Sequence, residues 1–514
     1  MITEILLFVS AILFFTFLLA NRRWRQLPPG PLGLPVIGHF HLLGPLLHTS
    51  LRDLSSRYGP LFSLKLGSVS CIVASTPDLA KAFLKDNDLA FSCRLNSQAV
   101  DHITYNASFA FAPYGQYWKF IKKWTTFELL GSRVIGQFVP VRTKEIHTLL
   151  RTIYSKAKIG ESVNISQELI KFSNNVICTM VWSIRSSETD GQAELTRSVV
   201  REVTQLFGQF NVSDYIWFCK NFDLQGFRKR FEETRRKYDS LVEGIITARQ
   251  NERNDCKRNG EKYKAKDFLD IILDLMEDEN TEIKLTREHI KAMILDFFIA
   301  GTDTTAILLE WALAELINNP KVLEKAQDEI QKVVGTHRVV EESDCPNLPY
   351  IQAIIKETFR LHPPIPVLSR KSIEDCYVNG YKIPKNTLVF INMWAIARDS
   401  KYWEDPFEFK PERFLSNSSN IDLKGQHFQL LPFGTGRRIC PGIPLAMQEL
   451  HATLAAAIQC FDFKVLNPSG AKGHGDRLLD MTERPGLTTP RAEELVCIPV
   501  PRIPDVLESL CAGC

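Results

Sequence analysis

The sequence lacks the marks of several protein classes. Its 62 basic and 59 acidic residues leave a formal net charge of +3, so no basic excess points to nucleic acid as a partner. The one C-x-x-C, Cys511 and Cys514, lies at the C-terminal end without a second pair or a histidine pair, so it does not predict a zinc site. The irregular spacing of the 12 cysteines is typical of free thiols in a reducing compartment.

Charge is nearly absent from the first 21 residues. Every residue from Ile5 to Ala20 is apolar except two hydroxyl residues, and the only charge before Arg22 is Glu4. A signal peptide is the alternative, because the run is short for a full span. However, no basic segment precedes the run, three arginines follow it between positions 22 and 25, and no small-x-small cleavage site is present. By the positive-inside rule, residues 1–21 are predicted to be an N-terminal membrane anchor with the body in the cytosol.

Clear linkers and internal repeats are missing from the rest of the 514 residues. Residues 22–38 are basic and rich in proline, which predicts a stiff hinge rather than a helix. An ordinary linker is the alternative for this segment. Length alone favours roughly two to four domains, but the absence of a further linker leaves residues 39–514 as one candidate domain.

The periodicity of this body predicts a mainly α fold with a minor β region. Residues 59–74 alternate and are β-branched, as in a hairpin, and residues 376–392 form a second β patch around an Asn-Gly turn. A long helix is predicted to begin at Thr286 and to break at Asn319-Pro320. The polar stretch 249–266 is predicted to be an exposed loop.

The stretch "LLPFGTGRRICPGIPLA", residues 430–446, surrounds one cysteine with rigid and positively charged backbone. Glycines at 434, 436 and 442 allow backbone N–H groups to approach the sulfur of Cys440, and a helix is predicted after Pro441. Such a setting favours a thiolate, which is the form that binds metal. A structural thiol is the alternative, since most lone buried cysteines bind nothing.

The pattern F-x-x-G-x-R-x-C-x-G is met by Phe433, Gly436, Arg438, Cys440 and Gly442. It resembles the cysteine-ligand loop of the cytochrome P450 haem-thiolate monooxygenases. The resemblance implies the P450 fold as one large helical domain, haem b (iron protoporphyrin IX) as cofactor, and Cys440 as the axial ligand of the haem iron. It also places Phe433 and Arg438 beside the haem.

A second motif, "KETFR", carries Glu357 and Arg360 on one helical face, and "PERF" supplies Arg413 further on. An isolated Glu–Arg pair at this spacing is usually a solvated surface pair. In the resemblance, the three residues form a buried structural triad behind the haem that does no chemistry.

A third motif, "AGTDTT", places glycine and threonine in the middle of the long apolar helix, where both are locally unfavourable. The resemblance implies an oxygen groove, opened by Gly301, in which Asp303 and Thr304 relay protons as catalytic residues. The alternative is close helix packing through small residues.

The resemblance also gives partners to the haem propionates. Trp118 and Lys122 in "YWKFIKK" match W-x-x-x-R/K, with lysine in place of the commoner arginine, and Arg370 matches a further propionate partner. For the two cations, the alternative is a surface position.

No nicotinamide or flavin site is evident, so electrons must come from a partner. The resemblance names it as the membrane-bound NADPH–cytochrome P450 reductase, and it implies a microsomal enzyme anchored in the endoplasmic reticulum membrane with its catalytic domain in the cytosol. Lys119, Lys123 and Arg437 are candidates for docking the acidic surface of the reductase, although a solvated face explains them equally well.

The candidate substrate pocket is apolar and aromatic, which suits a flat aromatic ligand but also an ordinary core. Its predicted members are Phe109, Phe111, Phe207, Ile299, Ala300, Ile365, Val367, Leu368 and Ser369.

Segments such as "FAPYGQYWKFIKK" and "EVTQLFGQFNVSDYIWFCKNFDLQGF" resemble plant flavone synthase II and flavanone 2-hydroxylase. These enzymes oxidise flavanones such as naringenin at C2 of the C ring, using O2 and electrons from NADPH, and give flavones directly or through a 2-hydroxyflavanone. Isoflavone synthases tend to carry Ser and Lys at the positions of Thr304 and Ser369, so the chain departs from them. The alternatives are a hydroxylase of isoflavonoids, pterocarpans or triterpenoids, a reductase-independent haem-thiolate isomerase or dehydratase, and a non-catalytic haem carrier.

Overall fold

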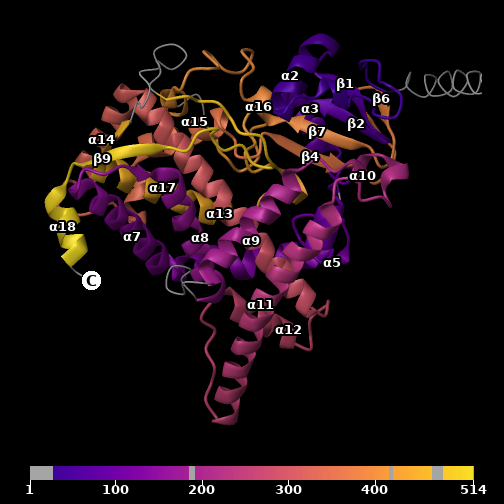
Figure 1. The fold of residues 1–514 in the computed structure, drawn as a ribbon. Helices are drawn as coiled ribbons and strands as arrows, with labels where there is room; N and C mark the ends of the chain where they lie inside the picture. The colour runs from indigo at the N-terminus through magenta and orange to yellow at the C-terminus, as the bar shows by residue number, and fades with distance from the viewer. Residues whose placement is uncertain (1–26, 96, 184–191, 416–420, 466–478, 513–514) are drawn as a thin grey trace, which may run out of the picture.

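The computed structural model describes residues 27–95, 97–183, 192–415, 421–465 and 479–512. The predicted anchor, residues 1–21, and the basic first part of the predicted hinge lie outside the described residues. Helices make up most of the described chain, together with three small sheets, as the sequence predicts for the fold class (Figure 1).

The helices follow the chain in a long series between two β regions. The helices before the central one are α2 (Leu47–Tyr58), α3 (Pro77–Lys81), α4 (Gln98–Ile103), α5 (Gln116–Trp124), α6 (Ser132–Gln137), α7 (Val139–Lys158), α8 (Ile165–Trp182), α9 (Gln192–Gly208), α10 (Val212–Tyr215), α11 (Phe227–Arg258) and α12 (Phe268–Glu277). The central helix and those after it are α13 (Arg287–Asn318), α14 (Pro320–Val333), α15 (Pro349–Leu361), α16 (Met393–Ile396), α17 (Ile443–Cys460) and α18 (Pro504–Ala512). Short irregular helices are η1 (Phe40–Leu42), η2 (Ala82–Asp86), η3 (Thr125–Leu129), η4 (Trp217–Cys219), η5 (Glu342–Asn347), η6 (Pro411–Phe414) and η7 (Gly436–Arg438).

The largest sheet has the order β1-β2-β7-β4 and contains the first predicted β region and the end of the second. Its strands are β1 (Leu61–Leu66), β2 (Val69–Ala74), β7 (Leu388–Asn392) and β4 (Val367–Lys371). β1 and β2 form the predicted antiparallel hairpin, β7 runs parallel to β2, and β4 returns antiparallel to β7, so that Ser369 faces Phe390 across the pair. β4 thereby brings its side chains to the edge of the helical body.

Two smaller sheets complete the β part. β5 (Cys376–Val378) and β6 (Tyr381–Ile383) pair around Asn379-Gly380, whose φ angles of 50° and 81° are those that an Asn-Gly hairpin turn requires. β3 (Val163–Asn164), β9 (Val496–Pro501) and β8 (Phe461–Val465) form the third sheet. Both the hairpin at 59–74 and the Asn-Gly turn are therefore confirmed.

α13 runs through the middle of the helical body (Figure 1). Its N-cap is Thr286, whose side chain accepts from the His289 amide while the His289 ring accepts from the Thr286 amide. The helix ends at Asn318, where Pro320 starts α14, so the predicted limits are confirmed. Among the helices of the described part, α13 alone is long and apolar enough to cross a membrane, and most of its apolar stretch is buried in the body. It is the core helix against which the site is built.

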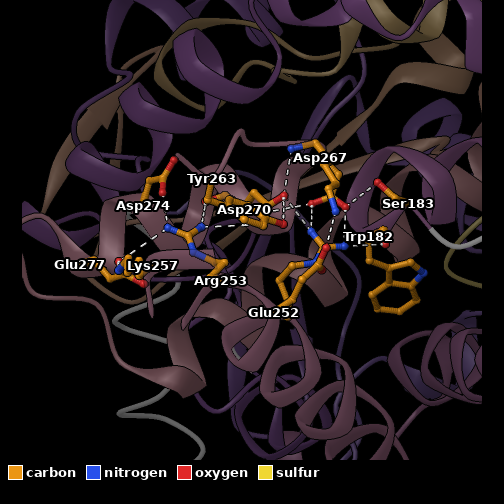
Figure 2. A network of polar contacts seen from close by, with 12 residues as sticks. Trp182, Ser183, Glu252, Arg253, Lys257, Tyr263, Asp267, Asp270, Asp274 and Glu277 are labelled. Carbon is orange, nitrogen blue, oxygen red and sulfur yellow. Dashed lines mark hydrogen bonds and ion pairs between the residues drawn. The ribbon is translucent and has the colours of Figure 1, made fainter. Parts of the chain in front are cut away.

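The prediction of a loop over 249–266 is wrong in its first half, because α11 continues to Arg258. Arg249 donates to both Asp267 carboxylate oxygens at 2.8 Å and lies 2.9 Å from Asp270, while Arg253 binds the Asp270 carbonyl and the Asp274 carboxylate. Figure 2 shows this network between α11 and α12. Polar composition favoured a loop, but the arginines are buried against acidic partners that lie up to 24 residues away. Residues 259–266 do form the predicted loop.

The described end of the predicted hinge, residues 27–38, lies along β1. The Ser63 amide donates to the Pro29 carbonyl, the Ser63 hydroxyl donates to the Pro28 carbonyl, and the His39 amide donates to the Lys65 carbonyl. This segment is consequently attached to the edge of the large sheet.

Candidate active site

A cavity of about 350 Å³ lies where α13, β4, the loop after α4 and the Cys440 loop meet. Its walls are mostly apolar, with a few charged side chains at one end. Of the predicted site residues, it is lined by Phe109, Phe111, Trp118, Lys122, Ile299, Ala300, Gly301, Thr304, Ile365, Val367, Leu368, Ser369, Phe433, Arg438 and Cys440. The structure thus brings residues from five distant segments to one space.

The loop before α17 presents the Cys440 sulfur to the cavity. Gly434 and Gly436 both have φ of +68°, which the turn needs, and the Cys440 amide donates to the Phe433 carbonyl at 3.0 Å. Burial raises the pKa of the Cys440 thiol, whereas a hydrogen bond from the Gly442 backbone and the nearby Lys122 and Arg94 lower it. Gly442 therefore contributes its N–H, and the surroundings contain the groups that would stabilise a thiolate.

Cations gather around the same end of the cavity with incompletely used donors. Within the described chain, three buried nitrogens of this cluster have no hydrogen-bond partner: Nε of Arg94, Nη2 of Arg370 and Nη1 of Arg438. Burial together with the other two arginines lowers the pKa of Arg370 well below its ordinary value, and burial with Arg94 lowers that of Arg438 to about 9. Lys122, whose Nζ donates to the Ile439 carbonyl, has its pKa lowered to about 8 by burial.

This cluster tests whether a haem fits the residues present. Buried cations that repel one another and keep free N–H groups are costly unless an anion accompanies them. A group with two carboxylates, an apolar ring and a metal that accepts a single sulfur ligand matches the cations, the apolar walls and Cys440. Arg94 was missed in the sequence, because an isolated arginine after "FSC" carries no motif that reveals its place.

Trp118 supports this cluster through its ring. Its indole N–H donates to the Phe109 carbonyl at 2.9 Å, and the Arg438 guanidinium lies 4.1 Å from the ring centroid. Arg370 does not line the cavity itself and donates through Nη1 to the Ser369 carbonyl at 2.9 Å.

The predicted relay residues face two different spaces. Thr304 lines the cavity and its hydroxyl donates to the Ala300 carbonyl at 2.6 Å. Asp303 lines a second, more polar cavity of about 820 Å³, where Thr204 hydrogen-bonds to its carboxylate. Burial raises the pKa of Asp303, and Arg201 and Arg484 oppose this shift. Thr204 borders both cavities and so connects the two spaces.

Gly301 lies where α13 crosses α8. A Cβ at this position would lie 2.8 Å from Cγ1 of Ile177 and even nearer to Cδ1, which real side chains do not tolerate. Gly301 therefore lies in the cavity wall and also allows α13 to approach Ile177 of α8 closely, while the predicted oxygen groove stays a prediction.

The Glu357, Arg360 and Arg413 side chains meet behind the Cys440 loop. Arg360 makes two 2.7 Å hydrogen bonds to the Glu357 carboxylate, and Arg413 Nε donates to the same carboxylate at 3.1 Å. Glu357 and Arg360 are fully buried, and Arg360 also donates to the carbonyls of Ala397, Pro406 and Glu408. The group ties α15 to the segment that ends in η6.

Phe207 is the one predicted pocket residue outside the first cavity, since it lines the second cavity instead. Its ring still meets that of Phe111 edge-on at 5.7 Å between centroids. It therefore supports the aromatic wall from behind.

Comparison with known proteins agrees with this geometry. A sequence profile of the cytochrome P450 family matches residues 28–488. The chain is 58% identical over 504 residues to cytochrome P450 93B2 of Gerbera hybrida, covering 97% of this chain and 96% of the relative. It is 55% identical over 519 residues to cytochrome P450 93B16 of Glycine max, covering 98% of each. It is also 49% identical to the 3,9-dihydroxypterocarpan 6A-monooxygenase of Glycine max, covering 96% of this chain and 97% of the relative.

The fold is similar to that of a zebra fish cytochrome P450 solved with progesterone, with a TM-score of 0.73 and 28% identity over 90% of this chain and all of that one. Family membership implies haem, a redox partner and a small-molecule substrate. The chain belongs to the cytochrome P450 family and is a haem-thiolate monooxygenase of its plant 93B group.

Proposed function

We propose that this monooxygenase converts flavanones such as naringenin to flavones by oxidation at C2 of the C ring, directly or through a 2-hydroxyflavanone. The observation that carries the proposal is an apolar cavity whose wall holds the Phe109 and Phe111 rings together with Cys440. Two aromatic rings suit a flat, ring-bearing substrate. The resemblance of the quoted segments to flavone synthase II and flavanone 2-hydroxylase supports the same substrate class.

The cofactor is haem b, and the Cys440 thiolate would hold its iron. Arg94, Lys122, Arg370 and Arg438 would hold its propionates. The three arginines keep N–H groups without a partner among the described residues, and burial lowers the pKa of all four cations, so an anion would stabilise them. Phe433 packs edge-on against Phe359 at 5.0 Å and keeps the Cys440 loop in place. When bound, thiolate-ligated haem supplies the activation of O2.

The chain's own residues handle the proton and the substrate. The Thr304 hydroxyl gives its hydrogen to the Ala300 carbonyl, so its oxygen remains free to accept a hydrogen bond from the cavity side. Asp303, whose pKa is raised by burial, holds a proton in the second cavity and exchanges it with solvent there. Ile299, Ala300, Ile365, Val367 and Leu368 exclude water from the substrate space.

Electrons come from NADPH through NADPH–cytochrome P450 reductase. Residues 1–21 anchor the enzyme in the endoplasmic reticulum membrane, residues 22–38 form the hinge, and residues 39–514 are the catalytic domain in the cytosol. Exposed apolar side chains support a membrane-facing side on the described chain: Leu32 is 84%, Trp217 76% and Leu224 66% exposed. The Phe40 ring packs on that of Phe210 at 4.5 Å, so the segments after the hinge and before α10 lie together.

Yeast microsomes that hold this chain and a plant reductase test the proposal. Naringenin and NADPH are supplied, and products are analysed before any acid treatment. We expect apigenin, or a 2-hydroxyflavanone that dehydrates to it. An intact carbon monoxide spectrum of thiolate-bound haem with no consumption of flavanone would refute the flavanone assignment and keep the monooxygenase.

A pterocarpan or isoflavonoid hydroxylase is the second candidate, because of the 49% identity to 3,9-dihydroxypterocarpan 6A-monooxygenase. Supplying a dihydroxypterocarpan to the same microsomes separates the two. A triterpenoid hydroxylase and a reductase-independent isomerase are less favoured. An isomerase would not need Asp303 and Thr304 to deliver protons, so the presence of both residues speaks against it.

A further inference from the structure

Asp296 is a buried carboxylate in the cavity wall that the proposed reaction does not use. It lies on α13 one turn before Ala300 and two turns before Thr304, so the three residues share one face of the helix. Its side chain is only 4% exposed and lines the first cavity. Burying a carboxylate costs free energy unless hydrogen bonds or cations compensate it, so the partners of Asp296 indicate its role.

All of its hydrogen-bond donors come from the loop after α4. The Ser108 hydroxyl donates to Oδ1 at 2.5 Å, and the Phe109 amide donates to Oδ2 at 2.8 Å. A hydrogen bond from the Ala110 backbone also favours the ionised carboxylate. Ser108 is itself 1% exposed, so its hydroxyl is shielded from the bulk solvent.

The same loop carries the aromatic wall. Phe109 and Phe111 line the cavity, while the loop carbonyls are held from the opposite side, Phe109 by Trp118 and Ala112 by Arg438 at 2.6 Å. Asp296 is thus the contact that fixes the N–H side of the loop to α13. Without it, the two rings would be held by the carbonyl contacts and by the ring contacts of Phe109 with Phe297 and of Phe111 with Phe207.

The charges around Asp296 fit a hydrogen-bonding role. Burial raises the pKa of its carboxyl to about 7, while the loop hydrogen bonds and the nearby Arg94 lower it. The other titratable groups that face it are Tyr117 of α5 and Tyr238 of α11. Both phenols are neutral at physiological pH, and burial raises their pKa values further. Arg94 stabilises the ionised Asp296 carboxylate by charge attraction, without a hydrogen bond between the two side chains.

We propose that Asp296 and Ser108 form a latch that fixes the loop of residues 108–111, and that Asp296 is thereby a positioning residue that sets substrate affinity and the site of oxidation. The latch deepens the proposed function, on which the choice of naringenin as probe rests. The role of Asp296 is carried through Phe109 and Phe111, whose rings contact the substrate.

Hydrogen exchange of the holoenzyme tests the latch without any substrate. In Asp296→Ala we expect amides of residues 108–112 to exchange about tenfold faster or more, since a hydrogen bond to a charged group is lost. The dissociation constant of naringenin, measured by its spectral shift, should rise about tenfold, and kcat/KM should fall mainly through KM. The ratio of oxidised positions in the product should also change, which a loss of stability alone would not cause.

Glu310→Gln is the matched control, because Glu310 is also a buried α13 carboxylate that accepts from a serine, Ser166, at 2.6 Å. It should leave exchange at residues 108–112 and naringenin affinity unchanged. If Asp296→Ala does not bind haem, Ser108→Ala replaces it and should show the same changes to a smaller extent.

Unchanged exchange at residues 108–112 in a folded variant would overturn the latch. Faster exchange with unchanged naringenin affinity and product ratio would overturn the positioning role. If the wild-type protein gives no spectral shift with naringenin, the proposed function has failed, while the exchange measurement still decides the latch.

Discussion

At the scale of single residues, the polar side chains of the cavity have most of their hydrogen-bond donors and acceptors already engaged by the protein. Thr304 is the clearest, because its hydrogen is engaged by Ala300 and its oxygen faces the cavity. The Thr304→Ala variant should retain haem and bind naringenin but lose the hydroxyl that accepts and passes a proton. We expect product formed per NADPH to fall by on the order of tenfold or more, with the missing electrons recovered as hydrogen peroxide.

Thr302→Ala is the control for that experiment. Thr302 lies two residues away on α13 but faces the second cavity, and its hydroxyl has no partner among the described residues. It should leave coupling near the wild-type value. Equal coupling in Thr304→Ala and the wild type would show that the hydroxyl relays no proton.

The sequence predicted those site residues that belong to short motifs. Cys440, Arg438 and Phe433 lie within eight positions of one another, so their local pattern revealed them. Arg94 and Asp296 were not predicted, because their partners lie far away in the sequence. Arg94 acts on Cys440, and Asp296 accepts from Ser108, which lies 188 positions earlier. Asp303 was predicted as a site residue, but its orientation toward a second cavity depends on how α9 lies over α13.

At the scale of elements, the crossing of α8 and α13 depends on the absence of one side chain. In Gly301→Ala, the new Cβ would overlap with the Ile177 side chain, so either this side chain or one of the two helices must shift. We expect a loss of about 1–3 kcal/mol in the free energy of unfolding, measured by thermal or denaturant unfolding of the holoenzyme.

Two further variants isolate that contact. Ile177→Ala removes both atoms that the new Cβ would meet, so the double variant should be more stable than the sum of the single effects predicts. Gly136→Ala is the matched control, because nothing lies within 4 Å of a Cβ at that helical position. Additivity in the double variant would contradict the proposed overlap.

The α11–α12 network gives a second prediction for elements. Arg249→Ala leaves Asp267 and Asp270, both fully or almost fully buried, without their nearest cation. Removing one partner of a buried ion pair costs about 3–5 kcal/mol, and we expect this loss to appear as faster hydrogen exchange in α12 and the end of α11.

Lys257→Ala removes an exposed cation from the same network and should cost at most about 1 kcal/mol. A similar cost for both variants would mean that burial does not strengthen the Arg249 contacts. This network is also why residues 249–258 could not be predicted as helix: local polarity favours a loop, and the stabilising carboxylates belong to the next helix.

At the scale of the whole molecule, stability should depend on one carboxyl group beside the cavity. Glu449 on α17 is 1% exposed, its Oε1 has no partner among the residues that the structure describes, and burial raises its pKa to about 8. An unfolded chain releases that proton near pH 4.3. Between these two values the folded state holds a proton that the unfolded state has lost, so stability falls as pH rises, by on the order of 1 kcal/mol per pH unit.

The Glu449→Gln variant keeps the shape of the side chain and removes its titratable carboxyl group. We expect its melting temperature to exceed that of the wild type at pH 8 and to approach it near pH 5. Glu324→Gln, on the exposed side of α14, is the control and should follow the wild type at both values. An equal pH slope in Glu449→Gln and the wild type would show that other groups cause the loss.

The backbone of Phe109 connects the wall that contacts the substrate with the residues that surround the cofactor. Its N–H is held by Asp296 in the substrate wall, and its carbonyl is held by Trp118, on which Arg438 stacks. Exchanging this loop between relatives to change substrate preference will therefore also alter cofactor occupancy. Libraries of variants at residues 108–112 should therefore be selected for substrate preference and haem content together, because a change in this loop affects both.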